Sequence, residues 1–321
     1  MKKAGRSARQ GKNGRRKESM RRAVVDLGSN TMRMEVYDEK EGQLQHIVSA
    51  KEVVGMIGYM EKGEISEEGI LRVVNGLRAF RETAVAVRVE RFNCFATAGL
   101  RAVKNAEDVV RRVKEQVGID VDIISGEEEA RLDFAGAYIP PEVEKGLVVD
   151  MGGGSTEIVR FADGHIDNCI SLPYGSLSLY KRFVKKIIPG AGELRKIKEF
   201  AEHQLECVDW LKSVGGHVCL IGGTGRAIAR LHQDVYGRAG EALQGYMFDA
   251  QDIAALMKWV LSHHKVGVRR ILRVEPDRIH TILPGMAALA RLVGYAGAAT
   301  VSLSRSGVRE GYLKTVMLND R

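Results

Sequence analysis

The chain has 321 residues, 45% hydrophobic and 28% charged, which is the composition of a globular protein with room for two domains. Four cysteines are scattered without a C-x-x-C pair, so neither a disulfide framework nor a thiolate zinc site is indicated. The net charge of +8 is concentrated at one end: residues 1–22 hold ten Lys/Arg and one Glu, and the rest is nearly balanced.

We expect residues 1–22 to be a disordered basic tail, because like charges stand in a block without apolar periodicity. The tail could tether a polyanion by counterion release, or it could be a solvated extension without a partner. Since the charge lies in the tail, no nucleic-acid partner is expected beyond non-specific tail contacts. No apolar run of signal-peptide or membrane-spanning length follows, so we expect a cytoplasmic protein without membrane contact.

The predicted elements alternate between strands and helices, which indicates an α/β fold. Period-two patterns predict early strands at 23–27, 31–37, 44–48 and 91–96, and helical spacing covers 66–87. Asn105 is predicted to open a helix that Gly118 closes. After a strand at 123–124, Ser125 and Glu128 form a capping-box pattern at the start of the next helix.

The strand–glycine turn–strand pattern of residues 23–37 then recurs. Strands are predicted at 147–150 and 156–161 around a glycine turn, and a third glycine turn at 222–225 opens a helix. Further helices are expected at 249–261, 281–293 and 307–317, with a strand at 299–303. We expect domain I at 23–130 and domain II at 131–321, with the last helix able to pack back on domain I.

The repeated strand–turn–strand units carry the sequences DLGSN from Asp26 and DMGGG from Asp150. A strand entering a glycine turn presents uncrowded backbone N–H groups that bind phosphates. Asp at the strand end sets a carboxylate beside them, where it can hold magnesium. A single Asp-Gly turn is an ordinary hairpin connector, but two copies and the turn at Gly222 favour phosphate binding.

Five segments carry a family resemblance: DLGSNTMR at 26–33, ATAGLR at 96–101, ISGEEEAR at 124–131, DMGGGSTE at 150–157 and GGT at 222–224. They resemble the exopolyphosphatase/guanosine pentaphosphate phosphohydrolase family of the actin-like ATPase and sugar kinase superfamily. The resemblance covers about 24–318. It implies two ribonuclease-H-like (actin-like ATPase) domains around a phosphate-binding cleft, and it allows a homodimer, for which no apolar stripe identifies an interface.

The resemblance also implies the site residues. Glu129 matches the catalytic glutamate, whereas Glu127 and Glu128 fit better as helix-start acids. Asp150 and Glu157 match the magnesium (or manganese) ligands, and Asp26 could assist them. The phosphate-binding residues are expected to be Gly28, Ser29, Asn30, Thr31, Arg33, Arg101, Gly152, Gly153, Gly154, Ser155, Gly222, Gly223 and Thr224.

Three of these roles have alternatives. Arg33 could instead form an ordinary cross-strand ion pair. Thr224 could serve an adenine-nucleotide site as well as polyphosphate. Glu129, at the positive end of a helix, need not have a raised pKa, because positioning can matter more than basicity.

The expected reaction is magnesium-assisted hydrolysis of the terminal phosphoanhydride of inorganic polyphosphate, with release of orthophosphate. The closest alternative substrate is guanosine pentaphosphate, since both offer a terminal phosphoanhydride to the same loops. A different class stays open: an ATP-binding or kinase-like member of the superfamily. The glutamate run at 127–129 favours hydrolysis over these.

Overall fold

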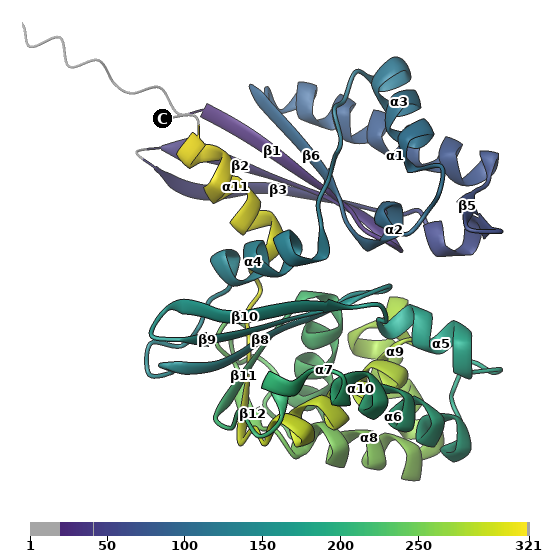
Figure 1. Ribbon diagram of the computed structural model, residues 1–321, viewed down its shortest axis with the longest axis vertical. Helices are drawn as coiled ribbons and strands as arrows, with labels where there is room; N and C mark the ends of the chain where they lie inside the picture. The colour runs from purple at the N-terminus through teal and green to yellow at the C-terminus, as the bar shows by residue number, and fades with distance from the viewer. Residues whose placement is uncertain (1–19, 41, 320–321) are drawn as a thin grey trace, which may run out of the picture.

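The computed structural model describes residues 20–40 and 42–319, folded into two lobes (Figure 1). The first lobe is built on a five-stranded sheet ordered β3-β2-β1-β6-β7. Its strands are β1 (Met20–Leu27), β2 (Thr31–Lys40), β3 (Gln43–Val53), β6 (Arg91–Ala96) and β7 (Asp122–Ile123). The first three run antiparallel, whereas β1, β6 and β7 are parallel.

Three helices belong to the first lobe: α1 (Glu67–Ala86), α2 (Ala98–Arg101) and α3 (Ala106–Val117), with a small hairpin of β4 (Met60–Glu61) and β5 (Glu64–Ile65). α1 buries Ile70, Leu77 and Phe80, the face that its helical spacing predicted. Gly118 ends α3 in the left-handed conformation, as expected. Asn105 precedes the first residue of α3 as its N-cap, as predicted, but its side-chain amide bonds to both backbone groups of Ile65 and not to the helix.

The second lobe repeats the plan around a six-stranded sheet ordered β10-β9-β8-β11-β13-β12. The strands are β8 (Lys145–Met151), β9 (Thr156–Ala162), β10 (His165–Leu172), β11 (His217–Ile221), β12 (Met247–Asp249) and β13 (Thr300–Leu303). Again an antiparallel meander, β8–β9–β10, continues into parallel strands β11 and β13. Its helices are α5 (Ser176–Phe183), α6 (Ala191–Glu206), α7 (Gly222–Val235), α8 (Asp252–Ser262), α9 (His264–Val274) and α10 (Ile282–Ala296).

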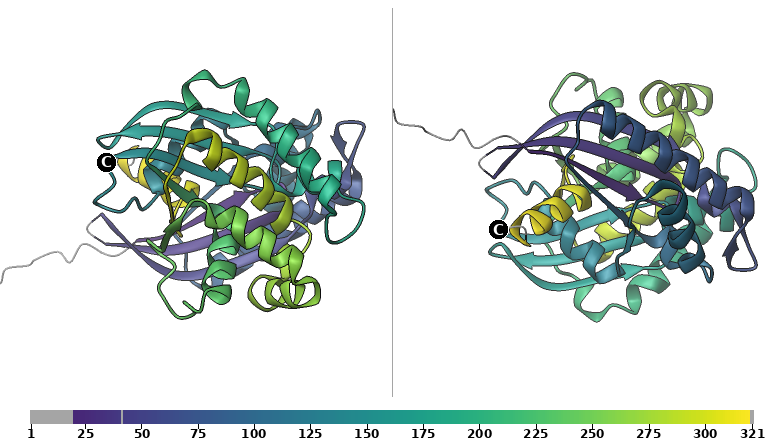
Figure 2. Two further views of the ribbon diagram at one scale, coloured as in Figure 1. Left: turned by 90° about the horizontal axis from the view of Figure 1, so that it is seen from below. Right: turned by 90° about the horizontal axis from the view of Figure 1, so that it is seen from above.

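Two helices lie between the sheets and connect the lobes: α4 (Gly126–Gly136) follows β7, and α11 (Val308–Asn319) follows β13 (Figures 1 and 2). They cross in close contact, since a Cβ on Gly136 would lie 1.9 Å from the carbonyl oxygen of Gly307. α11 then packs against the first sheet through Tyr312, whose ring stacks on Phe95 at 4.7 Å. The last helix therefore does return to the first lobe.

The predicted basic tail, residues 1–22, falls largely outside the described residues, but its end was placed too late. Met20, Arg21 and Arg22 form the start of β1. The reason is that both arginines have acidic partners on β2: Arg21 donates to Asp38 at 3.1 Å and Arg22 to Glu39 at 2.5 Å. None of the helices in the described ranges combines the length and apolar character needed to cross a lipid bilayer.

Candidate active site

The two Asp-x-Gly turns face each other across the cleft. In the first, the Gly28 N–H donates to the Thr31 carbonyl at 3.2 Å, and in the second the Gly152 N–H donates to the Ser155 carbonyl at 3.0 Å. The turns touch: a Cβ on Gly154 would lie only 2.8 Å from the Ser29 hydroxyl oxygen. A side chain at Gly154 would displace the Ser29 hydroxyl, so the close approach of the two turns favours glycine there.

The third glycine turn lies beside the second. Gly222 has φ +69°, and a Cβ on it would lie 2.1 Å from Oδ1 of Asp150. Only glycine can satisfy both conditions, so the turn is shaped around that carboxylate. Gly223 lies against the guanidinium of Arg278, which reaches it from the other end of the lobe. α7 begins at this turn and directs its unpaired N–H groups toward the cleft.

Glu129 is held on the cleft side of α4. Ser125 and Glu128 form the predicted capping box, which fixes the start of the helix, and Glu127 pairs with Arg131 at 2.7 Å on the solvent side. Glu129 points the other way and is 8% exposed. Its carboxylate accepts from Arg101 Nη1 at 2.9 Å, and the other Arg101 nitrogen, Nη2, lies 3.9 Å from Glu157 of the second lobe.

The site therefore concentrates acids. Burial raises the pKa of Glu129 well above its usual range, and the neighbouring Glu157 raises it further, while Arg101 opposes both effects. Burial and then the charge of Asp26 raise the pKa of Asp150 to about 6. Burial and then Asp150 raise the pKa of Glu157 to about 7. The expectation that Glu129 need not have a raised pKa did not allow for this crowding.

Asp26 has a cationic partner that the sequence did not indicate. Arg309, at the start of α11, donates to Asp26 Oδ2 at 3.2 Å and lies 3.9 Å from Glu35. Burial nevertheless raises the pKa of Asp26, with Arg309 as the largest opposing influence. No local pattern connects residues 26 and 309, so this contact depends on the return of the last helix.

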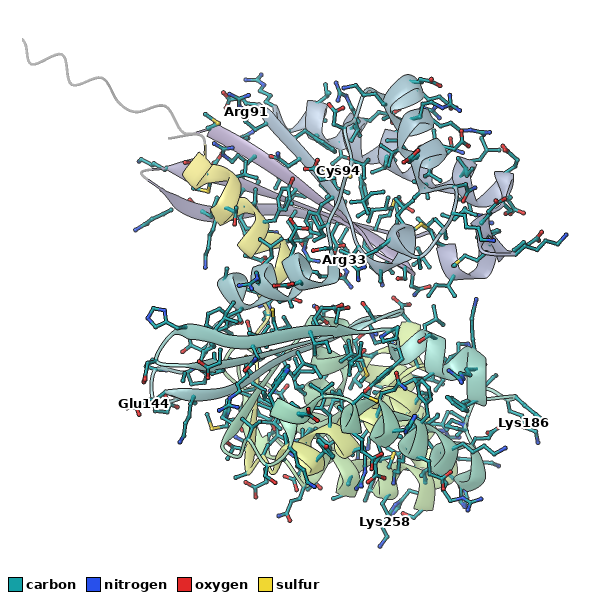
Figure 3. The ribbon with its side chains drawn as sticks, viewed as in Figure 1. Arg33, Arg91, Cys94, Glu144, Lys186 and Lys258 are labelled. Atoms are coloured by element: carbon teal, nitrogen blue, oxygen red, sulfur yellow. The ribbon has the colours of Figure 1, made fainter. Side chains whose placement is uncertain are left out.

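Three arginines crowd the other end of the same cavity: Arg33, Arg226 and Arg278. The pKa of Arg226 falls to about 10, first because of burial and second because of Arg33. Among the described residues the Arg33 side chain has no hydrogen bond or ion pair, so the cross-strand pair considered for it does not form. Figure 3 places Arg33 on the edge of the first lobe that faces the second. Arg226 lies 4.0 Å from Glu275, and Arg278 donates to Thr224 at 3.4 Å. Three half-buried guanidinium groups beside glycine turns form an anion-binding arrangement.

These groups line one cavity of about 280 Å³. Fourteen of the predicted site residues line it: Asp26, Gly28, Ser29, Asn30, Thr31, Arg33, Glu129, Asp150, Gly152, Gly153, Gly154, Ser155, Gly222 and Gly223. Arg101, Glu157 and Thr224 lie behind this lining. Thr224 is 1% exposed, with its hydroxyl 3.3 Å from that of Ser176. The acids and glycine turns that the sequence indicated thus lie together in the structure, whereas Arg226, Arg278 and Arg309 were not predicted.

Asp133 is a further acid that sequence reasoning missed. It lies one helical turn after Glu129 and is 1% exposed, yet neither carboxylate oxygen has a hydrogen-bond partner in the described structure. Burial and then the charge of Asp150 raise its pKa well above the usual range. The i, i+4 spacing from Glu129 was the available signal, since it places both side chains on one helix face.

Two lobes of the same plan, each presenting an acid and a glycine turn to one phosphate-sized cavity, define an actin-like fold of the phosphate-handling kind. The chain belongs to the Ppx/GppA phosphatase family, whose model matches residues 35–320. This confirms the resemblance drawn from the five segments, the α/β fold with two actin-like domains, and a hydrolase acting on phosphoanhydrides.

Solved structures agree. The Aquifex aeolicus Ppx/GppA family member is 28% identical, with a TM-score of 0.77 over 95% of this chain and 99% of that one. The type II variant of the Aquifex aeolicus Ppx/GppA phosphatase is 29% identical, with a TM-score of 0.73 over 93% of this chain and 99% of that one. An exopolyphosphatase from Cytophaga hutchinsonii is 23% identical and shares the fold, with a TM-score of 0.82 over 94% of this chain and 98% of that one.

Proposed function

We propose that the protein is a magnesium-dependent exopolyphosphatase that hydrolyses the terminal phosphoanhydride of inorganic polyphosphate in the cytoplasm. The observation that carries the proposal is the position of Glu129: a buried carboxylate, bonded to Arg101, in the wall of a cavity formed by facing phosphate loops. A base so placed can orient an attacking water toward a phosphate held by those loops.

The water oxygen forms a bond to the terminal phosphorus as the bridging P–O bond breaks, and the water proton passes to the Glu129 carboxylate. The shortened polyphosphate leaves with the bridging oxygen, and orthophosphate is released. The N–H groups of the turns at Gly28 and Gly153 stabilise charge on the terminal phosphate oxygens. Arg101 holds Glu129 in place. Other cations would therefore have to bind the phosphate that Arg101 was expected to bind.

The residues fit a magnesium ion. Burial raises the pKa values of the Asp26, Asp150 and Glu157 carboxyls. The charge of Asp26 raises that of Asp150 further, and the charge of Asp150 raises that of Glu157 further, so a cation beside these acids would relieve the repulsion. In the described part of the chain no three His, Cys, Asp or Glu side chains could enclose a metal on their own. Magnesium requires less than that: one or two carboxylates, with water and substrate phosphates completing its shell. It would neutralise developing charge on the transferred phosphate.

The lining of this cavity favours phosphates over a base. Among the described residues no aromatic side chain lines it, so a purine inside it would have no ring to stack on, whereas Tyr37 and His46 line the hollow beside it. Arginines occupy the outer end instead. Guanosine pentaphosphate remains the second candidate substrate, because the loops contact only terminal phosphates. An ATP-binding or kinase-like role is the third candidate.

The test is phosphate release from medium-length polyphosphate and from guanosine pentaphosphate, with and without magnesium, by the wild type and by Glu129→Gln. We expect magnesium-dependent release from polyphosphate and a fall of about 10²–10⁴-fold in kcat for the variant. Glu127→Gln, on the solvent side of the same turn, is the matched control and should retain activity. Tight ATP binding without release from either substrate would overturn the hydrolase proposal.

A further inference from the structure

The carbonyl groups of the second glycine turn are held from behind by the start of α5. The Gly152 carbonyl oxygen accepts from both the backbone N–H and the hydroxyl of Ser176, at 2.9 and 3.1 Å. The Gly153 carbonyl oxygen accepts from the backbone N–H groups of Leu177 and Ser178, at 3.1 and 2.9 Å. These hydrogen bonds direct both carbonyl groups toward α5.

The orientation of the two carbonyl groups fixes that of the N–H groups beside them. In a trans peptide the C=O and the N–H point in opposite directions, and none of the described peptide bonds is cis. The N–H groups of Gly153 and Gly154 therefore point away from α5. Neither has an acceptor among the described residues, and both glycines line the active-site cavity. The turn thus presents two unpaired donors to a ligand in that cavity.

The Ser176 hydroxyl is the last member of a chain of hydrogen bonds that begins at a cation. Arg278 Nη1 donates to the Thr224 hydroxyl at 3.4 Å, and the Thr224 hydroxyl donates to that of Ser176 at 3.3 Å. A guanidinium can only donate and a hydroxyl has one proton, so the chain runs in one direction, from Arg278 to the Gly152 carbonyl oxygen. A charged donor at its start polarises each bond that follows, including the peptide that carries the Gly153 N–H.

The packing leaves this chain little room to rearrange. Ser176 and Thr224 are each 1% exposed. A Cβ on Gly285 in α10 would lie 2.7 Å from Thr224 Cγ2 and 3.3 Å from Ser176 Cβ, so the helix backbone packs directly on both side chains. A Cβ on Gly175 would lie 2.5 Å from the Gly152 carbonyl oxygen, so the start of α5 also meets the turn backbone to backbone.

We propose that Ser176 and Thr224 are positioning residues for the reaction. Through them Arg278 holds the Gly152 carbonyl group toward α5, so that the unpaired N–H groups of the turn are aimed at the terminal phosphate before it binds. The inference rests on the proposed function and deepens it, because Thr224 acts on the phosphate through the turn and not by the direct contact expected from the sequence. Preorganised donors act most on charge that develops in the transition state, so the network affects kcat more than KM.

The experiment measures kcat and KM for tripolyphosphate in the wild type, Ser176→Ala, Thr224→Val and the double variant. We expect kcat to fall about tenfold in Ser176→Ala and about three- to tenfold in Thr224→Val, with KM within about threefold of the wild type. The double variant should be no slower than Ser176→Ala alone, because the two hydroxyls act in series. Thr224→Ser keeps the hydroxyl and should retain the wild-type kcat.

Ser302→Ala is the matched control for a loss of stability. The Ser302 hydroxyl is equally buried, at 0% exposed, but it lies 2.7 Å from Nε2 of His217 in β11 and not at a glycine turn. We expect this variant to lower the melting temperature and to leave kcat unchanged. An equal fall of kcat in Ser302→Ala and Ser176→Ala would assign a merely structural role to Ser176 and overturn the inference.

Binding of orthovanadate separates the network from turnover. Vanadate takes the five-coordinate geometry of a phosphoryl group under attack, so its affinity reports on the N–H groups of the turn without hydrolysis. Calorimetry should show vanadate binding weakened about tenfold in Ser176→Ala, with orthophosphate binding changed much less.

The remaining outcomes are distinct. Unchanged kcat and unchanged vanadate affinity in Ser176→Ala would overturn the inference and leave the proposed function intact. A double variant slowed by the product of the two single effects would show that the hydroxyls act independently, which contradicts the chain. If the wild type hydrolyses no polyphosphate, the proposed function fails, and vanadate binding still decides whether the network positions the turn.

Discussion

Glu129 and Arg101 show how one ion pair sets both position and proton affinity. The helix start places Glu129 in the cleft, and Arg101, the last residue of α2, donates to it at 2.9 Å. Burial and the charge of Glu157 raise the pKa of the Glu129 carboxyl. The Arg101 guanidinium opposes this rise and so favours the ionised form.

Arg101→Gln should therefore move the acidic limb of the pH dependence of kcat/KM to higher pH. The sign follows from the charge: without the cation the protonated form of Glu129 is favoured, its pKa rises further, and more alkaline solution is needed to ionise it. Full pH–rate profiles for the wild type and variant measure the shift. Arg131→Gln, which pairs with Glu127 on the exposed side, is the control. A uniformly lower profile with an unmoved limb would show that Arg101 acts on phosphate alone.

The buried side chain of Asp133 lowers the free energy of unfolding. A fully buried carboxyl without partners destabilises the fold when ionised and remains unfavourable when neutral. Because its pKa is raised in the folded state, the folded chain keeps a proton that the unfolded chain releases. The contribution of Asp133 to the free energy of unfolding therefore becomes less favourable as the pH rises above the usual pKa of an aspartate.

Asp133→Leu should stabilise the protein by about 1–3 kcal/mol at pH 7.5, and the gain should shrink as the pH approaches 4.5. Urea unfolding at the two pH values measures the free energy of unfolding. Asp249→Leu, at an exposed position in β12, is the control and should change little at either pH. Destabilisation of Asp133→Leu at pH 7.5 would mean that the carboxyl gains a partner in solution.

At the scale of elements, the crossing of α4 and α11 is what connects the lobes. It is close because glycines stand on both helices: a Cβ on Gly311 would lie 1.9 Å from the Leu132 carbonyl oxygen. The same crossing sets Arg309 against Asp26 and places Gly307 beside Asp133. The geometry of the site thus depends on two helix backbones that touch without side chains between them.

Gly311→Ala should destabilise the protein by about 1–3 kcal/mol, since the added methyl forces the two helices apart. It should also lower activity, because Arg309 moves with α11. Thermal unfolding and phosphate release measure the two effects. Gly294→Ala in α10 meets no atom within 4 Å and should instead stabilise by about 0.5–1 kcal/mol. Equal behaviour of the two variants would contradict a tight crossing.

Contacts between residues close in the sequence were predictable, whereas contacts between distant residues were not. The capping box at Ser125 involves residues three apart, so its pattern is visible in the chain and was confirmed. The strand His165–Leu172 was missed, because only Leu172 is buried and its exposed and half-buried residues do not alternate. Arg309 lies 283 positions from Asp26, and nothing near either residue indicates the pair.

At the scale of the whole molecule, folding brings five acids to the junction of two lobes: Asp26, Glu129, Asp133, Asp150 and Glu157. The family, the paired lobes and the hydrolase class were predictable because their motifs are local and repeated. The balance of charge in the cleft was not predictable. It depends on arginines from α7, from the segment between α9 and α10, and from α11, which lie together only in the folded chain.

Magnesium should raise the melting temperature more at pH 8 than at pH 5. Asp150 and Glu157 have folded pKa values of about 6 and 7, so the folded state keeps protons that the unfolded chain releases from about pH 4 upward. Stability therefore falls as the pH rises through that window, and a cation replaces the lost protons. Calorimetry with and without magnesium measures the effect. Asp150→Asn should reduce it, whereas Asp167→Asn, on exposed β10, should not. An equal rise at both pH values would contradict binding at these acids.

The contact between Ser29 and Gly154 has a consequence for how a polymer can be degraded. A Cβ on Gly154 would lie 2.8 Å from the Ser29 hydroxyl oxygen, so the two turns close the cleft at this contact. For the proposed exopolyphosphatase, a strand of phosphates would then enter by a free terminus and would not thread between the turns. We therefore expect a ring-shaped metaphosphate, which has no free terminus, to be hydrolysed far more slowly than a linear chain.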